Sequence, residues 1–335
     1  MSIDSLTGNL YVADSYRVIR MINKTTGNIT TIAGGGRIKR RGDGGLAVLA
    51  TLSYPNDVAT DPLNGNIYIA DGNTIRMITK STGIITTIAG NSTRAGYTGD
   101  GGLATLATLS YAQGIDVDPR TGDLYIADTY NNAVRMIKKS TGIISTIAGT
   151  GGGGYAGDGG PATSAMLYGP RDLTIEAATG NIYIADKYNS AIRMVTKSTG
   201  IITTIAGVGV SDYGGDGGLA TMASLHYPSG VAVDALSGNL IIADTDNNLI
   251  RMVTRSTGII TTIAGTEYSG YGGNGGPAIY ATLFLPKRVA VDASSGMIYI
   301  TDYDGASIRN IVGASATAIS PPTMAPTGTG KVKWK

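Results

Sequence analysis

Six aspartates and six arginines recur along the chain at a nearly constant interval. Each aspartate closes the phrase Ile-Ala-Asp or a close variant, at Asp14, Asp71, Asp128, Asp186, Asp244 and Asp302. An arginine follows each one in the phrase Ile-Arg-Met or a variant, at Arg20, Arg76, Arg135, Arg193, Arg251 and Arg309. A carboxylate beside a guanidinium serves either as a catalytic charge pair or as a structural ion pair. Because every repeat carries the pair, we expect it to belong to the framework.

Few side chains suited to metal binding or nucleophilic catalysis are present. The sequence has one histidine, His226, and no cysteine. Histidine clusters and thiolate sites for zinc are therefore excluded, as is a cysteine nucleophile. We expect no metal, no cofactor and no catalytic residue, and we assign His226 to a loop or packing role.

A glycine-rich connector recurs between the repeats and carries another acidic motif. The sequence Gly-Asp-Gly-Gly occupies residues 42–45, 99–102, 157–160 and 215–218, and Asn274 replaces the aspartate in 273–276. These connectors lack the alternating aspartates of a calcium loop and the helix start of a phosphate cradle. We interpret them as tight turns between repeats.

The repeat itself predicts four short β-strands. In the unit that begins at Tyr227, runs rich in Val, Ile and Thr cover residues 230–234, 239–244, 249–254 and 258–264, with Gly, Asn, Asp and Ser between them. The second and fourth runs are apolar almost throughout, so both faces of each sheet must be covered. Six such sheets packed around an axis bury both faces. The sequence therefore predicts an all-β, six-bladed β-propeller of four-stranded antiparallel blades over residues 1–319.

This repeat resembles the NHL repeat. The resemblance lies in the pattern GNIYIADxxNNxIRM, which follows a VxVD strand, and it extends from residue 4 to about residue 312. It implies a propeller fold. NHL propellers occur in receptors, lyases, RNA-binding proteins and surface proteins, so the resemblance leaves the activity open.

The two ends depart from the repeat. The first unit retains only residues 1–4 of its inner strand, and the last loses the TGIITTIAG run, so its outer strand, if formed, covers the weaker segment 316–320. No exchange of strands between the termini is visible, and we expect the seam between the first and last blades to depend on packing alone. Unpaired outer edges, such as residues 200–206, invite self-association.

Positions that vary between repeats are free to form a binding site. One set precedes each inner strand, at Asn56, Asp57, Gln113, Gly114, Arg171, Asp172, Ser229, Gly230, Lys287 and Arg288. A second set lies in the hairpin after each repeated aspartate, at Tyr16, Arg17, Tyr130, Asn131, Tyr188, Asn189, Asp246, Asn247, Tyr303 and Asp304. Up-and-down strand order puts both sets on the connector face. We predict a binding rim composed of Asn56, Asp57, Gln113, Arg171, Asp172, Lys287, Arg288, Tyr130 and Tyr188.

Basic residues are also spaced along the opposite face. We expect the ring formed by Lys24, Lys80, Lys139, Lys197 and Arg255 to be a solvated surface. A denser run, Arg37, Lys39, Arg40 and Arg41, offers weak support for RNA binding. The net charge of only +2 argues against DNA and against RNA as the main partner.

Several features bear on the compartment. The chain shows neither a signal peptide nor a transmembrane segment. Residues 320–335 are rich in Pro, Thr and Gly and are predicted to form a linker or tail resembling the O-glycosylated stalks of surface proteins. Sequons at Asn23, Asn28 and Asn91 are candidate N-glycosylation sites. We predict an extracellular or cell-surface location.

Three functions follow as hypotheses. The first is a non-enzymatic structural or interaction scaffold that binds a protein or glycan, or copies of itself. The second is a lyase or hydrolase working in the central channel, for which the sequence offers Asp57, Asp172 and the polar rim. The third is an RNA-binding NHL module.

Overall fold

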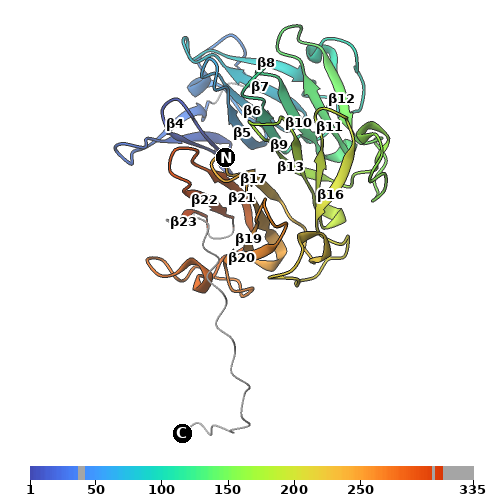
Figure 1. Ribbon diagram of the computed structural model, residues 1–335. Helices are drawn as coiled ribbons and strands as arrows, with labels where there is room; N and C mark the ends of the chain where they lie inside the picture. The colour runs from blue at the N-terminus through green and yellow to red at the C-terminus, as the bar shows by residue number, and fades with distance from the viewer. Residues whose placement is uncertain (37–41, 304–305, 312–335) are drawn as a thin grey trace, which may run out of the picture.

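The computed structural model describes residues 1–36, 42–303 and 306–311. Six antiparallel sheets form a ring of blades around a central axis (Figure 1). Five sheets have four strands, and the sixth has three strands among the described residues. The predicted six-bladed β-propeller is confirmed. The expected outer strand at 316–320, the segment 320–335, Asp304 and the basic residues Arg37, Lys39, Arg40 and Arg41 lie outside the described residues.

Each blade is a meander whose strands follow the chain order from the axis outward. Blades 1 to 3 contain β1 (Ser2–Ile3), β2 (Leu10–Asp14), β3 (Val18–Ile22), β4 (Ile29–Gly34); β5 (Pro55–Thr60), β6 (Ile67–Asp71), β7 (Thr74–Ile78), β8 (Ile85–Gly90); β9 (Gly114–Val117), β10 (Leu124–Asp128), β11 (Ala133–Ile137), β12 (Ile144–Ala148). Blades 4 to 6 contain β13 (Pro170–Ile175), β14 (Ile182–Asp186), β15 (Ala191–Val195), β16 (Ile202–Ala206); β17 (Gly230–Val233), β18 (Leu240–Asp244), β19 (Leu249–Val253), β20 (Ile260–Ala264); β21 (Pro286–Val291), β22 (Ile298–Asp302), β23 (Ser307–Ile311). The four strands predicted after Tyr227 correspond to β17–β20.

Short 3-10 turns complete the loops. Those in the connectors are η1 (Ala47–Leu49), η2 (Ala104–Leu106), η4 (Ala162–Ser164), η6 (Ala220–Met222) and η8 (Ala278–Tyr280). Those in the hairpins between second and third strands are η3 (Thr129–Asn131), η5 (Lys187–Asn189) and η7 (Thr245–Asn247).

The hydrophobic core lies between blades rather than within them. Each of five apolar clusters joins two neighbouring blades; one brings Ile75 and Ala89 of blade 2 against Leu109 and Ile126, which belong to blade 3 and its connector. This arrangement explains why the second and fourth strands are apolar on both faces. Among the described residues no such cluster joins blade 6 to blade 1.

The basic residues on the opposite face are exposed, as expected, but they also form contacts between blades. Each cation reaches back to a polar side chain of the preceding blade. The pairs are Lys80 with the Tyr11 hydroxyl at 3.3 Å, Lys139 with Asp61 at 2.6 Å, Lys197 with the Tyr125 hydroxyl, Arg255 with Glu176, and Lys24 with Asp292 at 2.9 Å. These partly exposed contacts are individually weak, but they repeat around the ring as latches between blades.

The seam between blades 1 and 6 therefore does not depend on packing alone. Lys24 of blade 1 donates to Asp292 at 2.9 Å and to the Ser294 hydroxyl at 3.3 Å, both in blade 6. Burial alone would raise the pKa of Asp292, but hydrogen bonds from Ser294 and Lys24 lower it well below its usual value. Blades 1 and 6 are thus joined by the same kind of contact, from a basic side chain to a polar side chain of the neighbouring blade, that joins the other blades.

The expectation of unpaired outer edges is also wrong for the inner four repeats of the chain. In blade 4, the amide of Ile202 donates to the Gly160 carbonyl at 3.0 Å, and the Ile202 carbonyl accepts from the Gly159 amide at 2.8 Å. The Gly200 carbonyl accepts from Ala162 at 2.8 Å. Equivalent bonds from the preceding connector cover the outer strands of blades 2, 3 and 5. Among the described residues, the outer strand β4 of blade 1 receives no such bonds from a connector.

Candidate binding face

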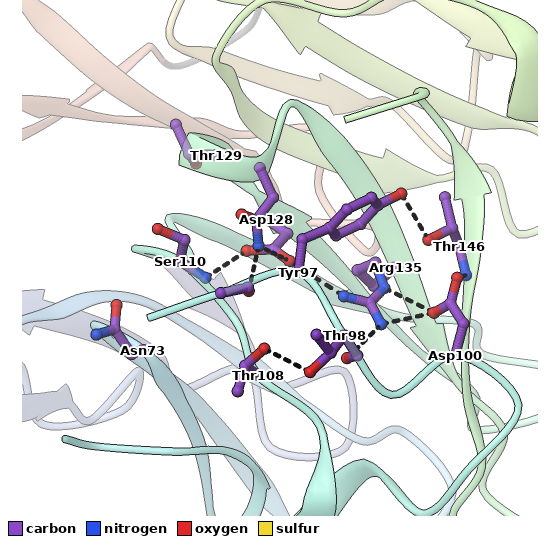
Figure 2. Close-up of polar contacts among 12 residues, drawn as sticks. Asn73, Tyr97, Thr98, Asp100, Thr108, Ser110, Asp128, Thr129, Arg135 and Thr146 are labelled. Atoms are coloured by element: carbon purple, nitrogen blue, oxygen red, sulfur yellow. Dashed lines mark hydrogen bonds and ion pairs between the residues drawn. The ribbon is translucent and has the colours of Figure 1, made fainter. Parts of the chain in front are cut away.

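The repeated aspartate and arginine form a buried ion pair inside each of blades 2 to 5. In blade 3, Arg135 is fully buried and its Nη1 lies 3.3 Å from Asp128 Oδ2 (Figure 2). Asp128 also accepts hydrogen bonds from the Ser110 amide and the Asn131 side chain. Burial raises the pKa of Asp128 to about 6, although these bonds and Arg135 act in the opposite direction. The pair anchors the blade and is closed to solvent.

The connector is a lid over this buried arginine, a role that the sequence reasoning missed. Asp100 of the connector lies 2.5 Å from Arg135 Nη2 and accepts the Thr146 amide of the outer strand (Figure 2). The Tyr97 ring covers the guanidinium at 5.1 Å, and its hydroxyl lies 3.0 Å from Thr146 Oγ1. Gly99 has φ +95°, and a Cβ there would lie 2.6 Å from the Ala107 Cα. The motif GYxGDGG thus encodes a cation–π contact, an ion pair and a tight turn.

A fixed spacing could have revealed the lid. The connector aspartate precedes its arginine by 35 residues in blades 3, 4 and 5, where the pairs are Asp100 with Arg135, Asp158 with Arg193 and Asp216 with Arg251. In blade 6 the connector has Asn274, and Arg309 donates instead to the carbonyls of Thr282 and Gly272.

A charged cluster fills the central channel. Arg288, 8% exposed, pairs with Asp172 and lies 3.5 Å from Asp57, and its Nη2 donates to the Gln113 carbonyl. Asp57 also contacts the Met1 nitrogen. Burial alone would lower the pKa of Arg288, but the two carboxylates raise it. The guanidinium therefore crosses the channel as a plug.

The channel carboxylates are also bonded to the next blade. Asp57 accepts the Ile115 amide at 3.1 Å, and Asp172 accepts the Val231 amide at 3.1 Å. The partly buried Asp116 accepts the Ile175 amide at 2.8 Å, and burial raises its pKa to about 7. These acids connect the inner strands and have few oxygen lone pairs left for a substrate.

Exposed tyrosines surround the mouth of the channel on the connector face. Over blades 2 and 3, Tyr111 stacks on Tyr130 with centroids 4.9 Å apart, and Tyr54 lies 6.2 Å from Tyr111. Tyr130 and Tyr54 are 63% and 56% exposed. We use the name tyrosine rim for Tyr54, Tyr111, Tyr130, Tyr168, Tyr188 and Tyr227, together with Arg171 and Lys187.

The tyrosine rim continues over blades 4 and 5. Tyr188 lies 5.1 Å from Tyr168 and 5.7 Å from Tyr227 between ring centroids. The ammonium of Lys187 lies 5.1 Å from the Tyr188 centroid and 5.7 Å from that of Tyr227. His226 contacts Tyr227, as the loop or packing role predicts.

The structure divides the predicted rim residues into two groups. Asp57, Gln113, Asp172 and Arg288 are buried in the channel, and the Asn56 amide donates to the Ala112 carbonyl at 2.9 Å. Arg171, Lys287, Tyr130 and Tyr188 lie at or near the surface of the connector face.

Sequence reasoning missed five members of the rim, and a signal for four of them was present. A tyrosine stands just before each inner strand of blades 2 to 5, in the phrases SYP, SYAQG, LYGP and HYPSG. The missed residues are Tyr54, Tyr111, Tyr168, Tyr227 and Lys187.

The described residues also bear on the predicted glycosylation sites, on metal ligands and on membrane spans. Asn28 and Asn91 are exposed, whereas the Asn23 side chain accepts the amides of Thr25 and Thr26, and glycosylation of all three remains a prediction. Among residues 1–36, 42–303 and 306–311, no three His, Cys, Asp or Glu side chains gather as metal ligands would. No helix in the described part of the chain has the length and apolarity of a membrane span.

The fold and this face define the chain as a six-bladed β-propeller with a plugged channel and an aromatic rim. Comparison with family models then identifies the repeat. The Teneurin NHL domain matches residues 1–97, and the NHL repeat matches residues 109–135 and 225–251. The chain is an NHL-repeat β-propeller.

Curated relatives match much of the chain but are far longer. Protein SUPPRESSOR OF QUENCHING 1, chloroplastic, of Arabidopsis thaliana is 30% identical over 275 residues, covering 78% of this chain and 25% of the relative. Teneurin-4 of Homo sapiens is 31% identical over 342 residues, covering 91% and 12%. The chain thus spans a quarter or less of these relatives.

Solved structures share the fold at low identity. An auxiliary nutrient binding protein from Bacteroides thetaiotaomicron VPI-5482 superposes with a TM-score of 0.63 at 16% identity, over 90% of this chain and 65% of that one. A chain of a nidogen/laminin complex gives 0.55 at 13% identity, over 91% and 93%. These structures share the propeller fold with the chain.

Proposed function

We propose that this chain is a non-enzymatic interaction module of the extracellular space or cell surface, which binds a protein or glycan partner through the tyrosine rim. The observation that carries the proposal is the concentration of exposed tyrosines with Arg171 and Lys187 on the connector face. Tyrosine and arginine provide large contact area and directional bonds, and both are enriched at the centres of interfaces.

The channel supports a binding function over a catalytic one. A lyase or hydrolase would use Asp57 or Asp172, yet both carboxylates pair with Arg288 and accept an amide of the next blade. A general base must be able to reach and accept a substrate proton. In this arrangement the ion pairs and hydrogen bonds of the channel residues join the inner strands of different blades.

Two features support the location. The chain is similar to the teneurins, which suggests a cell-surface or extracellular context, and residues 320–335 have the composition of a surface-protein stalk. The same repeat occurs in a chloroplastic relative, so the location rests on these features and not on the fold. Self-association of this module would use the terminal blades, because connectors cover the outer edges of blades 2 to 5.

An array of immobilised glycans and protein ectodomains tests this function. Binding of the wild-type chain should fall in the double variant Tyr130→Ala/Tyr188→Ala. The matched control is Leu63→Ala/Leu236→Ala, which removes two exposed apolar side chains from turns on the opposite face. Equal binding by the wild type and the rim variant, or an equal loss in the control, would reject the rim as the binding site.

A further inference from the structure

The tyrosine rim holds two cations without a salt bridge. Arg171 and Lys187 form no salt bridge within the described residues, although Asp172 attracts Arg171 and Asp246 attracts Lys187 at longer range. Burial, followed by repulsion from Arg288, lowers the pKa of Arg171, and burial with repulsion from Arg171 lowers that of Lys187. This contrasts with Arg76, Arg135, Arg193 and Arg251, each of which has two carboxylate partners. The rim therefore concentrates positive charge that no salt bridge within the described residues neutralises.

Aromatic rings border these cations. Lys187 lies near the rings of both Tyr188 and Tyr227. Arg171, the second residue of β13, is close enough to Lys187 to lower the pKa of that ammonium group. The chain makes room for this arrangement at Gly169, where a Cβ would lie 2.5 Å from the Tyr188 ring.

Neighbouring blades hold two of the rings in place. Tyr111 and Tyr227 have φ of 53° and 48°, a conformation that non-glycine residues rarely adopt. The Asn73 side chain of blade 2 accepts the Tyr111 amide at 2.9 Å, and the Ser190 hydroxyl of blade 4 accepts that of Tyr227 at 3.4 Å. Gly169 and Leu285 have the same backbone conformation and the same bond from the preceding blade, so the repeat itself fixes where these residues stand.

We propose that the tyrosine rim binds a polysaccharide that carries carboxylate or sulfate groups. This inference rests on the proposed function and specifies its ligand. Sugar rings present C–H faces, which are attracted to the negative face of an aromatic ring. Their anionic groups accept charge-assisted hydrogen bonds from guanidinium and ammonium groups. Lys187 with the rings of Tyr188 and Tyr227 supplies both kinds of contact, and Arg171 and the stacked Tyr111 extend them on the same face.

The surroundings favour a sugar chain over a peptide. The tyrosines of the rim and Lys187 lie in loops and hairpins, and Arg171 lies in the inner strand β13, so the rim offers no outer strand edge for β-strand addition. Two open hollows of the described residues lie elsewhere. One, of about 270 Å³, is bordered by residues 273–276 and β23; the other, of about 310 Å³, is bordered by Glu176, Asp234 and Arg255 on the opposite face.

Titration with anionic polymers and their neutral counterparts tests this ligand. The probes are polygalacturonate, its methyl-esterified neutral form, dextran sulfate and unmodified dextran, with binding measured by calorimetry or interferometry at two salt concentrations. We expect the wild-type chain to bind at least one anionic polymer and neither neutral one, and binding to weaken as salt rises. The two anionic probes distinguish carboxylate from sulfate recognition.

Charge-removing variants locate the site. Arg171→Gln/Lys187→Gln should weaken binding to the preferred anionic polymer about tenfold or more, because charged hydrogen bonds are lost. The control Arg94→Gln/Lys138→Gln removes one exposed arginine and one exposed lysine away from the rim, and should change affinity less than twofold. Thermal melting verifies that both variants fold.

Other outcomes overturn the inference in distinguishable ways. Equal binding to the neutral and anionic polymers removes the anionic requirement and leaves a glycan-binding rim. Rim-dependent binding of an array protein without polymer binding rejects the sugar class while the interaction face stands. Tighter rim-dependent binding of polyuridylate than of either anionic polymer reassigns the rim to single-stranded RNA. Absence of binding to every polymer and every array partner rejects the proposed function as well.

Discussion

Replacement of Arg193 is the sharpest test of the framework. Its side chain is fully buried, lies 3.4 Å from Asp186 and 2.5 Å from Asp158, and donates to the carbonyls of Ala156 and Met166. Arg193→Ala leaves Asp186 as a buried charge without its cation, a change that typically costs about 3–5 kcal/mol of unfolding free energy. Asp186 retains bonds from the Tyr168 amide and the Asn189 side chain, which places the expected loss near the lower end.

Two related variants calibrate this value. Asp158→Ala removes a carboxylate whose side chain is 44% exposed and leaves the Asp186 pair intact, so we expect a loss of only about 1–2 kcal/mol. Asp186→Ala should lower stability while Asp158 still neutralises Arg193. The double variant Asp186→Ala/Arg193→Ala should cost less than the sum of the single changes, because no lone charge remains buried.

Urea unfolding followed by circular dichroism measures these losses, and binding of a rim ligand is measured on the same samples. All variants should keep their affinity, because the pair lies inside the blade. Three results would refute the structural role. Arg193→Ala could unfold at the wild-type urea midpoint, or Asp158→Ala could lose more unfolding free energy than Arg193→Ala. A variant could also lose ligand binding while its stability is unchanged.

Three further predictions address pH, backbone and assembly. The pKa of Asp116 is raised in the folded state to about 7, so its stabilising contribution is present below the unfolded pKa and is lost as pH rises through 7. Asp116→Asn should therefore gain stability over the wild type between pH 4 and 8 in melting experiments, and parallel pH profiles would contradict this. Gly207→Ala should destabilise the protein more than Gly200→Ala. Both glycines have positive φ, but only at Gly207 would a Cβ meet a backbone oxygen, that of Ser190 at 2.3 Å. Equal denaturation midpoints of the two variants would argue against this. We expect the wild-type chain to form concentration-dependent dimers, measured by light scattering. The dimers should disappear in Ile29→Lys, which charges the uncovered edge of β4, and should persist after truncation at Ile319. A wild-type chain that stays monomeric at high concentration excludes them.

Much of the architecture was readable from the sequence because it repeats. Six copies of the Asp and Arg markers predicted six blades, and the apolar runs predicted sheets covered on both faces, as the clusters between blades show. The turns with glycine before each second strand were equally readable, since only a few residue types adopt their backbone conformation.

Contacts between repeats were not readable in the same way. Lys24 and Asp292 are 268 residues apart, and nothing in either local sequence indicates that the ring closes through them. The contacts of the exposed basic ring were missed for this reason, because the same lysine pattern suits a surface with or without contacts between blades. The connector lids were missed because Asp100 and Arg135 meet only after the chain has passed through two strands.

The sequence by itself determined the repeat number, the blade pattern and the variable positions, because local propensity and apolar periodicity express these directly. The tertiary structure decided which variable residues are buried and which are exposed. Arg171 is the second residue of β13 and Arg288 is the third residue of β21, yet Arg288 pairs with carboxylates in the channel while Arg171 lies at the rim. A single residue of register turns a strand side chain to the other face, and only the assembled ring shows which face meets the axis.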